Sequence, residues 1–415
     1  MKPWRGFLIT FGTLLMLFLE AGVAGAVQLT MWDWHEPRAT LTREFAAIYM
    51  QENPHVDIEI SLQTGGPFRE KLIVALAAGA TPDIVQVHNE WAEEFAGEFE
   101  PYPEILFPRG ELQSEYLLFD MTSTIDDSVY FLPVGIMTGA IYYNKGILEA
   151  AGYDRPPVDW PEFGVAARRL TRIESDGSAS QGGFLFLNDF MWFWTDLVYQ
   201  YGGTLLTDRG VTFATEAFSQ GGEILLDLKN AEVHPAGVSF EAGNAAMRYQ
   251  WTWYEAFARN LGFDYGVSVI PTPTGEPLPA RGRNNVELGL AVFKDITPEK
   301  KDEAFRFIRW LFDNEEYIVK LNLSVGTIPS RTAYWDRDEI INGPAMQALV
   351  QQAPYTVFPG AVKSWYWNLL SEAAQRVQQG EPLTSVLQDA QRQGDAKFSE
   401  DPIRSVEHLY APPAR

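Results

Sequence analysis

Two short segments combine hydrogen-bonding and aromatic side chains in the way that a binding site for a polar ligand requires. One spans residues 34–36 and the other spans residues 88–91. Each directly follows an apolar run that is typical of a buried strand. In open α/β sheets, ligands bind just beyond the carboxyl ends of the strands. Our first candidates for ligand contact are therefore Trp34, His35, Glu36, His88, Asn89 and Glu90.

The second segment is positioned by a predicted helix and a predicted strand. Phe68, Leu72 and Leu76 recur every four residues, which gives the helix one apolar face. Gly79 supplies a stop at the C-terminal end of the helix, and the β-branched run 83–87 then predicts a buried strand. The polar residues begin where this strand ends, which places them at one edge of a sheet.

Helical and extended patterns continue along the chain. We predict strands over residues 29–33, 56–60, 83–87, 129–133, 140–144, 265–270 and 287–293, and helices over residues 41–49, 68–78, 160–171, 190–201, 240–249 and 301–312. The N-terminal β-α-β-α-β order implies an α/β protein with a doubly wound parallel sheet. Two domains joined by more than one extended crossover would enclose a cleft, which is a preferred site for small ligands.

The first 26 residues predict a cleavable secretory signal. Lys2 and Arg5 precede an apolar run over residues 7–19, and the small residues 24–26 provide a cleavage pattern. The apolar run is shorter than the about 20 residues that a membrane-spanning helix needs. We expect the mature protein to begin near Val27 and to diffuse in the periplasm, because the chain has no cysteine that could carry a lipid anchor.

Composition excludes several classes of function. The absence of cysteine excludes disulfides and thiolate chemistry, and a formal charge of −23 argues against nucleic acid and anionic membranes as partners. The chain length of 415 residues suggests two domains. The five histidines show no metal-ligand spacing, and the sequence has no P-loop for nucleotide hydrolysis. We therefore predict neither a metal nor a cofactor.

A series of short motifs follows in order along almost the whole mature chain. The motifs are Leu29–Trp32, Glu52–Val56, Ala77–Val85, Tyr130–Pro133, Tyr142–Lys145, Trp160–Phe163, Gly202–Gly203 and Phe240–Met247. Together they resemble the extracellular solute-binding proteins of ABC transporters, in particular the sugar-binding group that is similar to maltose-binding protein. Two positions depart from the family pattern: Pro161 replaces the usual acidic residue, and Asn244 stands where lysine is common.

The resemblance implies a two-lobed periplasmic-binding-protein fold without catalysis. Each lobe would hold a mostly parallel sheet flanked by helices, and hinge segments would join the lobes. We predict an N-terminal lobe over residues 27–135 and 286–335, and a C-terminal lobe over residues 136–285 and 336–415. The implied partners are a small carbohydrate in the cleft and ABC permease subunits in the inner membrane. We expect the protein to be a monomer.

A carbohydrate needs planar hydrogen-bonding partners for its hydroxyls and aromatic rings for its C–H faces. The resemblance implies stacking positions at Trp253, shortly after the GNAAM motif, and at Trp192, which precedes the paired glycine by about ten residues. A third stacking position falls on a late helix, at Trp367 or Trp365. Thr138 lies where relatives approach the ligand with polar side chains.

Alternatives stay open for several of these side chains. Glu36 and Glu90 are the best carboxylate partners for sugar hydroxyls, but each fits a solvated surface charge equally well. His88 is more often a structural residue. In tryptophan pairs spaced by two residues, we expect one ring at the ligand and the other in the core, because such positions do not share a helix face. Asn285, just before a predicted strand, serves either the hinge or the ligand.

Two other functions are alternatives to sugar binding. A phosphorylated polyol such as glycerol 3-phosphate would need cationic residues in the cleft, and the candidates are Arg248, Arg281, Arg283 and Arg331. A secreted glycoside hydrolase would need two carboxylates that flank the scissile bond, yet nothing distinguishes the pair Asp126 and Asp127 from surface charge. The 13 tryptophans favour a neutral sugar, and we predict a di- or oligosaccharide.

Overall fold

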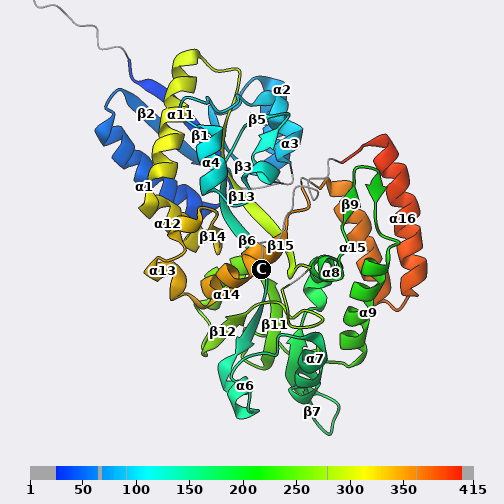
Figure 1. The fold of residues 1–415 in the computed structure, drawn as a ribbon. Coiled ribbons are helices and arrows are strands. Elements are labelled where there is room, and N and C mark those ends of the chain that lie inside the picture. Colours follow the sequence, from blue (N-terminus) through cyan, green and yellow to red (C-terminus); the bar gives the residue numbers. More distant parts are fainter. Residues whose placement is uncertain (1–24, 64–67, 90, 278, 361, 404–415) are drawn as a thin grey trace, which may run out of the picture.

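The computed structural model describes residues 25–63, 68–89, 91–277, 279–360 and 362–403. It shows an α/β protein with two lobes, one in the upper part of Figure 1 and one below it, so the predicted two-lobed fold is confirmed. Residues 1–24 of the predicted leader lie outside the described residues. Within the described part of the chain, no helix combines the length and the apolarity needed to cross a membrane.

The chain first builds the upper lobe. Its early elements are β1 (Val27–Asp33), α1 (Glu36–Glu52), β2 (Val56–Leu62), α2 (Phe68–Ala78), β3 (Ile84–His88), α3 (Ala92–Phe95), α4 (Arg109–Glu115), α5 (Phe119–Thr122), β4 (Thr124–Ile125) and β5 (Ser128–Val129). A later segment adds α11 (Pro298–Asp313), α12 (Glu315–Val325) and β14 (Ile328–Pro329). The strand β1 pairs in parallel with both β2 and β3.

Both faces of the upper sheet are covered by helices. Successive strand residues point to opposite sides, so each face presents apolar side chains that a helix can bury. In β3, Ile84 belongs to a core shared with α1 and α11, whereas Val85 and Val87 belong to a core shared with α2 and α3. Figure 1 shows α1 and α2 on opposite sides of this lobe. Helix α2 ends at Ala78, and Gly79 then adopts a left-handed φ of 63°. The predicted glycine stop is thus confirmed.

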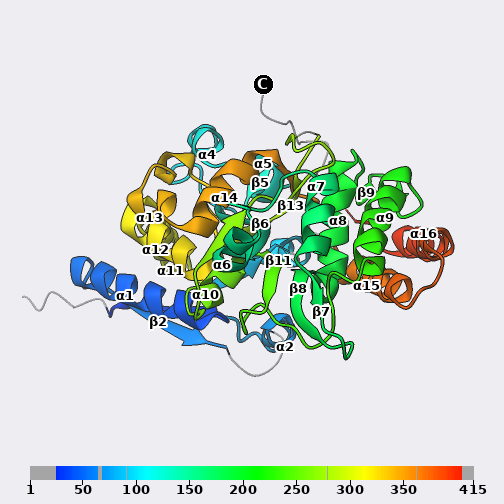
Figure 2. The ribbon, with the colours of Figure 1, turned by 90° about the horizontal axis from the view of Figure 1, so that it is seen from below.

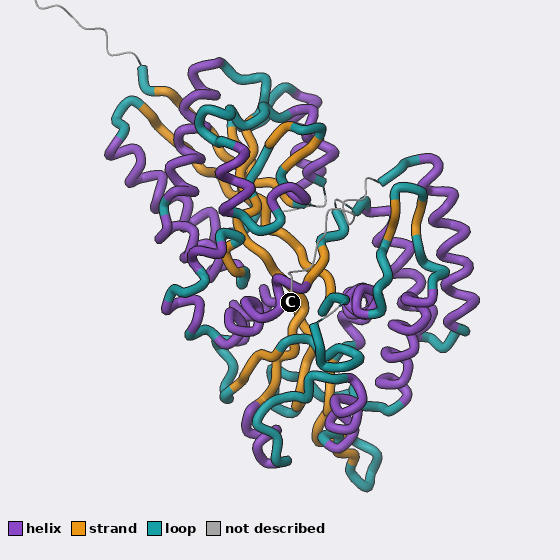
Figure 3. Tube along the Cα trace, viewed as in Figure 1, coloured by secondary structure: helices purple, strands orange, loops and turns teal. Residues whose placement is uncertain are grey.

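Two long strands carry the sheet into the lower lobe. They are β6 (Pro133–Asn144) and β13 (Gly282–Val292), and Figure 3 shows strands running through the middle of the molecule. The main sheet follows the order β2-β1-β3-β13-β6-β11-β8-β7. It is mixed, in place of the mostly parallel sheets that we predicted, because β13 pairs antiparallel with both β3 and β6, and β6 pairs antiparallel with β11. We continue to propose the lobe boundaries at residues 135/136, 285/286 and 335/336.

On these proposed boundaries, the remaining elements belong to the lower lobe. They are α6 (Lys145–Ala150), α7 (Trp160–Arg169), β7 (Arg172–Ile173), β8 (Ala179–Leu185), α8 (Phe190–Gln200), β9 (Leu206–Thr207), β10 (Gly210–Val211), α9 (Glu216–Asn230), β11 (Ala245–Trp251), α10 (Glu255–Ala258), β12 (Tyr265–Ser268), α13 (Asp338–Ile341), α14 (Pro344–Gln352), β15 (Thr356–Val357), α15 (Ser364–Gln378) and α16 (Leu383–Glu400). Of these elements, α13 also contacts α12 of the upper lobe. Figure 2 shows α15 and α16 beside α8 and α9 at one end of the molecule, and these helices contact one another.

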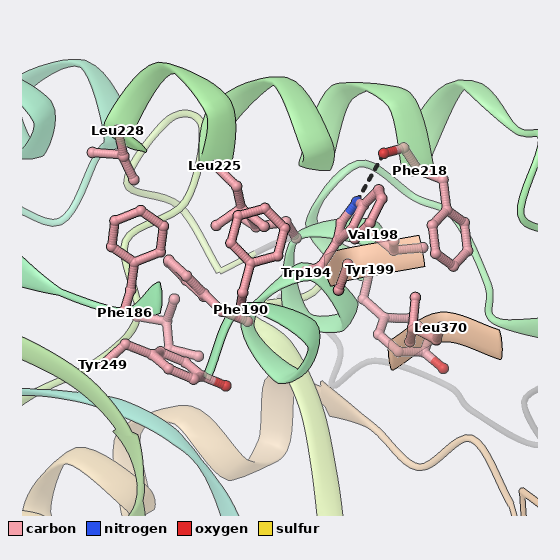
Figure 4. Close-up of a cluster of buried hydrophobic side chains, with 14 of the residues drawn as sticks. Phe186, Phe190, Trp194, Val198, Tyr199, Phe218, Leu225, Leu228, Tyr249 and Leu370 are labelled. Atoms are coloured by element: carbon pink, nitrogen blue, oxygen red, sulfur yellow. Dashed lines mark hydrogen bonds between the residues drawn. The ribbon is translucent and has the colours of Figure 1, made fainter. Parts of the chain in front are cut away.

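The core of the lower lobe is strongly aromatic. Phe190 and Trp194 of α8 are fully buried, and the indole N–H of Trp194 donates to the carbonyl of Phe218 in α9 at 2.9 Å (Figure 4). Phe193 of the same helix stacks on Tyr249, with ring centroids 4.4 Å apart. These contacts fix the rotation of α8, so that its other side is available to the cleft.

The predicted helix over residues 240–249 is wrong, because residues 245–251 form strand β11. Its alanines suit a helix locally, but the segment lies between β6, with which it pairs antiparallel, and β8, with which it pairs in parallel. Ladder hydrogen bonds on both sides satisfy the buried backbone groups, so tertiary pairing overrides local propensity. The strands predicted over 129–133 and 140–144 are likewise revised: β5 is short, and β6 is one long strand.

A buried carboxylate lies against the two crossing strands. Asp196 of α8 is fully buried, and its Oδ1 accepts from the backbone N–H of Arg283 at 2.7 Å. Its Oδ2 accepts from the hydroxyl of Tyr249 at 2.6 Å. A Cβ atom at Gly139 or Gly282 would lie 2.7 or 2.6 Å from these carboxylate oxygens. Glycine on both strands therefore permits this close approach.

The variant Gly282→Ala tests this packing. We expect it to lower the free energy of unfolding by about 1–3 kcal/mol, because the added methyl group overlaps the carboxylate of Asp196. Chemical denaturation measures the change. Gly110→Ala in α4 is the control, since nothing lies within 4 Å of its added Cβ. Equal stabilities of the two variants would contradict the close approach.

Candidate functional site

A cleft lies between the lobes where the crossing strands pass. It holds a cavity of about 440 Å³, here called the cleft cavity, which both lobes and both crossing strands line. The lining residues are Trp34, His35, Arg38, His88, Met137, Asp189, Trp192, Gln250, Trp251, Trp253, Ala256, Phe257, Arg283, Asn285, Glu287, Ser324 and Val325. Its size and its mixture of aromatic and hydrogen-bonding groups suit a small-molecule site.

The upper lobe presents one indole and two imidazoles to this cavity. Trp34 follows β1, and its ring centroid lies 4.9 Å from that of Phe68. His35 caps α1, where its Nδ1 accepts from the backbone N–H of Arg38 at 3.4 Å. Burial and then the charge of Arg38 lower the pKa of His35, so the ring is neutral at pH 7. His88 ends β3 and completes this side.

Three charged residues form a buried cluster at the cleft cavity, here called the charged floor: Asp33, Arg38 and Glu287. Arg38 and Glu287 line the cavity, and the fully buried Asp33 lies behind them. Arg38 donates to Asp33 through Nε at 2.8 Å and through a terminal nitrogen at 2.7 Å, and its other terminal nitrogen donates to Glu287. Both carboxylates raise the pKa of Arg38 despite its burial. Two carboxylates thus share one guanidinium, and Glu287, which lines the cavity, can accept hydrogen bonds from a ligand.

The lower lobe contributes most of the aromatic surface. Trp192 comes from α8, Trp251 from the end of β11, Trp253 from the turn that follows, and Phe257 from α10. Trp253 and Phe257 remain 41% and 63% exposed. Large aromatic side chains left open beside a cavity are typical of binding surfaces. These rings can cover an apolar ligand face.

Asp189, just before α8, adds a carboxylate to the same side. Its Oδ2 accepts from the amide of Gln250 at 3.3 Å. Burial raises the pKa of Asp189 to about 6, against the opposing effects of Arg248 and this hydrogen bond. The group is thus ionised at neutral pH and can accept hydrogen bonds from ligand hydroxyls.

A second cavity of about 710 Å³, here called the side cavity, shares Trp192 with the cleft cavity. Helix α15 supplies Trp365, Trp367 and Asn368, and Trp91 comes from the upper lobe. Four of the charged groups at its border form two ion pairs: Arg69 with Glu94, and Lys363 with Asp401. Trp192 therefore stands between two spaces that both lobes enclose.

The predicted residues that the structure describes fall into three groups. The cleft cavity is lined by Trp34, His35, His88, Trp192, Trp253 and Asn285. The side cavity is lined by Trp365 and Trp367. Three further residues line neither cavity: Glu36 is an exposed first residue of α1, and Asn89 and Thr138 are buried. The prediction for Glu90 falls outside the described residues.

Two of the buried residues support the cleft indirectly. The amide of Asn89 donates to the side-chain oxygen of Asn285, which orients that cleft residue. Thr138 lies on β6 and accepts a hydrogen bond from Gln352 of α14. Both side chains therefore act on the crossing strands rather than at the cavity surface.

The tryptophan pairs differ from expectation. Trp194 is core and Trp192 faces the cavities, as expected, but Trp251 and Trp253 both line the cleft cavity. Trp365 and Trp367 likewise both line the side cavity. The helical rule does not apply at 251–253, because the chain changes there from a strand to a 3₁₀ turn.

Several lining residues were not among the candidates, notably Arg38, Asp189, Gln250 and Phe257. Of these residues, Asp189 was the easiest to predict from the sequence, because it directly precedes an aromatic helix. Arg38 could not be predicted without knowing that it pairs with Glu287, which is distant in the sequence. Among the described residues, no group of three or more His, Cys, Asp or Glu side chains is placed to hold a metal.

Of the four arginines considered for a phosphate ligand, Arg283 lines the cleft cavity. The other three do not line this cavity and interact elsewhere. Arg248 pairs with Glu241, Arg281 donates to backbone carbonyls, and Arg331 donates to Glu115 at 2.5 Å. The four side chains therefore do not converge on one anion.

The chain is similar to a known protein family and to individual known proteins. The family described as bacterial extracellular solute-binding protein matches residues 32–318. A putative binding protein of Brucella abortus (strain 2308) is 23% identical over 418 residues, which cover 95% of this chain and 98% of that protein.

Two solved structures show the same fold. The cyclic alpha-maltosyl-1,6-maltose binding protein from Arthrobacter globiformis aligns with a TM-score of 0.76 and 19% identity over 91% of this chain and 100% of its own. UgpB from Mycobacterium tuberculosis, in complex with glycerophosphocholine, aligns with a TM-score of 0.75 and 19% identity over the same shares of the two chains.

Asp189 predicts a pH dependence of ligand affinity. A ligand whose hydroxyls donate to this carboxylate should bind best above pH 6, and its affinity should fall about tenfold as the group is protonated below its raised pKa. Calorimetric titrations across this range measure the effect. In Asp189→Asn the ligand affinity should be low and should not change with pH. If the variant keeps the pH dependence of the wild type, Asp189 is excluded as the titrating group.

Proposed function

Because the chain belongs to the bacterial extracellular solute-binding proteins, we propose that its cleft captures a neutral carbohydrate for an ABC importer. The observation that carries this proposal is the composition of the cleft cavity. Aromatic rings of the lower lobe share it with the charged floor and imidazoles of the upper lobe. Sugars need both kinds of group, since their C–H faces stack on rings and their hydroxyls donate and accept hydrogen bonds.

The charges of the site favour a neutral ligand over a phosphorylated one. Arg38, the most deeply placed cation, is already shared by two carboxylates, and a phosphate there would meet Asp33 and Glu287 as well. Asp189 adds a further negative charge to the lining. A phosphorylated polyol stays the second candidate, because Arg283 lines the cavity and the similar structure of UgpB holds glycerophosphocholine.

The arrangement of the two cavities favours a di- or oligosaccharide. Trp192 belongs to both cavities, so a ligand stacked on it has room on either side. Trp365 and Trp367 would then meet sugar units beyond those near Trp253. The maltosyl-maltose-binding neighbour is consistent with a ligand of this length.

Capture follows from the two-lobed architecture. A ligand that contacts both lobes gains its full interaction energy only when the lobes close, so binding shifts the population towards the closed state. We propose that permease subunits in the inner membrane recognise this closed state. The proposal places the protein in the periplasm as a monomer, after removal of a leader over residues 1–26.

We propose binding without catalysis. Asp126 and Asp127, the carboxylate pair considered for glycoside hydrolysis, have positive φ angles of 48° and 63° in the turn between β4 and β5. They do not belong to the lining of either cavity. Their position fits a surface turn, where Asp tolerates the left-handed conformation.

A thermal-shift screen of neutral sugars, polyols and glycerol phosphates tests the proposal. A neutral di- or oligosaccharide should raise the melting temperature, and Trp253→Ala should abolish most of this shift because it removes a stacking face worth about 1–3 kcal/mol. Trp310→Ala, on α11 outside both cavities, is the matched control and should retain the shift. A response to phosphorylated polyols alone would overturn the carbohydrate assignment.

A further inference from the structure

The guanidinium of Arg283 lies among three tryptophan rings, here called the tryptophan cage. Its Cζ atom lies 4.7 Å from the ring centroid of Trp192, 4.7 Å from that of Trp251 and 4.8 Å from that of Trp367. The rings come from α8, β11 and α15, which are far apart in the sequence. Arg283 itself is only 6% exposed. One buried cation thus contacts three elements of the lower lobe.

The tryptophan cage is also the wall between the two cavities. Trp251 lines the cleft cavity, Trp367 lines the side cavity, and Trp192 lines both. The rings of Trp192 and Trp367 are 5.1 Å apart and tilted by 56°. A guanidinium attracts the negative faces of aromatic rings, and its planar shape lets it stack on them. Arg283 therefore interacts with all three rings at once.

The backbone of Arg283 is anchored at the crossing strands. Its N–H donates to Asp196, and its neighbour Asn284 lies opposite Thr138 of β6. Two residues beyond Arg283 on the same strand, Asn285 lines the cleft cavity. The side chain that holds the cage thus belongs to a strand that also continues into the upper lobe.

We propose that Arg283 is a positioning residue for ligand binding: it sets the stacking surface of the cleft and ties that surface to β13. The proposal rests on the proposed function, since the ligand is taken to be a neutral sugar that stacks on the caged rings. Arg283 acts through the tryptophans and not as a charged partner of the ligand. A planar cation is required, because a compact ammonium cannot stack on the rings in the same way.

Three variants test the role. Arg283→Met removes the charge at similar length, and Arg283→Lys keeps the charge without the planar group. Arg281→Met is the matched control, because Arg281 is a half-buried arginine two residues from Arg283 that donates to the carbonyls of Ile270 and Gly275. Far-ultraviolet circular dichroism and thermal unfolding report on whether each variant folds.

The first measurement uses the ligand-free protein. Near-ultraviolet circular dichroism and tryptophan fluorescence report on the packing of the caged rings. We expect Arg283→Met to lose part of the near-ultraviolet signal while its far-ultraviolet spectrum is retained. Arg283→Lys should lie between Arg283→Met and the wild type, and Arg281→Met should match the wild type. A wild-type near-ultraviolet spectrum in Arg283→Met would overturn the proposal, whatever the ligand.

The second measurement is a calorimetric titration with maltotriose as the probe. We expect Arg283→Met to bind it about tenfold more weakly than wild type, with partial recovery in Arg283→Lys. Unchanged affinity in a variant with a disturbed cage spectrum would also overturn the proposal. If wild type itself binds glycerophosphocholine and no neutral sugar, the proposed function fails, and the ligand-free spectra still decide whether Arg283 organises the rings.

Discussion

The antiparallel pairing of β6 with β13 is the contact on which the rest of this structure depends. Asn285 on β13 lies directly opposite Met137 on β6, and both residues line the cleft cavity. A slip of one residue would turn such side chains to the other face of the sheet. The two strands therefore fix both the relation of the lobes and the set of groups that the cavity displays.

The pairing of buried charged groups with partners follows from the same strands. Glu287 of β13 meets Arg38 of α1, and the peptide N–H of Arg283 meets the carboxylate of Asp196. Loss of one partner would leave the other buried and unpaired, which is costly, so these contacts hold the groups in place at the junction where both lobes meet. They also leave the cavity with hydrogen-bond acceptors and aromatic faces in place of unshared cations. That balance is what suits a hydroxylated ligand.

Local signals in the sequence predicted much of the fold. The spacing of Phe68 and Leu72 and the stop at Gly79 determined α2, and the alternation in β2 was equally clear. The helix predicted over residues 240–249 failed because pairing on both sides, which a single sequence does not display, decided the conformation of β11. The ends of predicted strands indicated Trp34, His35 and His88 as site residues, because their position depends only on where one strand ends.

The remaining site residues depend on contacts between distant parts of the chain. Arg38 and Glu287 are 249 residues apart, and the local sequence around either residue does not predict that they pair. Arg283 was considered for a phosphate ligand, but its three tryptophan neighbours come from separate elements. Site residues at the ends of strands can be predicted from the sequence. Ion pairs and ring contacts between distant parts of the chain can be identified only in the folded protein.

The most direct test of the central claim, that the cleft selects neutral carbohydrate, is native mass spectrometry of the protein in a competition. The protein is equilibrated with equimolar maltose, maltotriose, glycerol 3-phosphate and glycerophosphocholine, and the mass of the bound ligand identifies the one that it selects. Complexes with a neutral sugar, lost in Trp253→Ala, are the predicted result. Complexes with the phosphorylated compounds alone would contradict the claim.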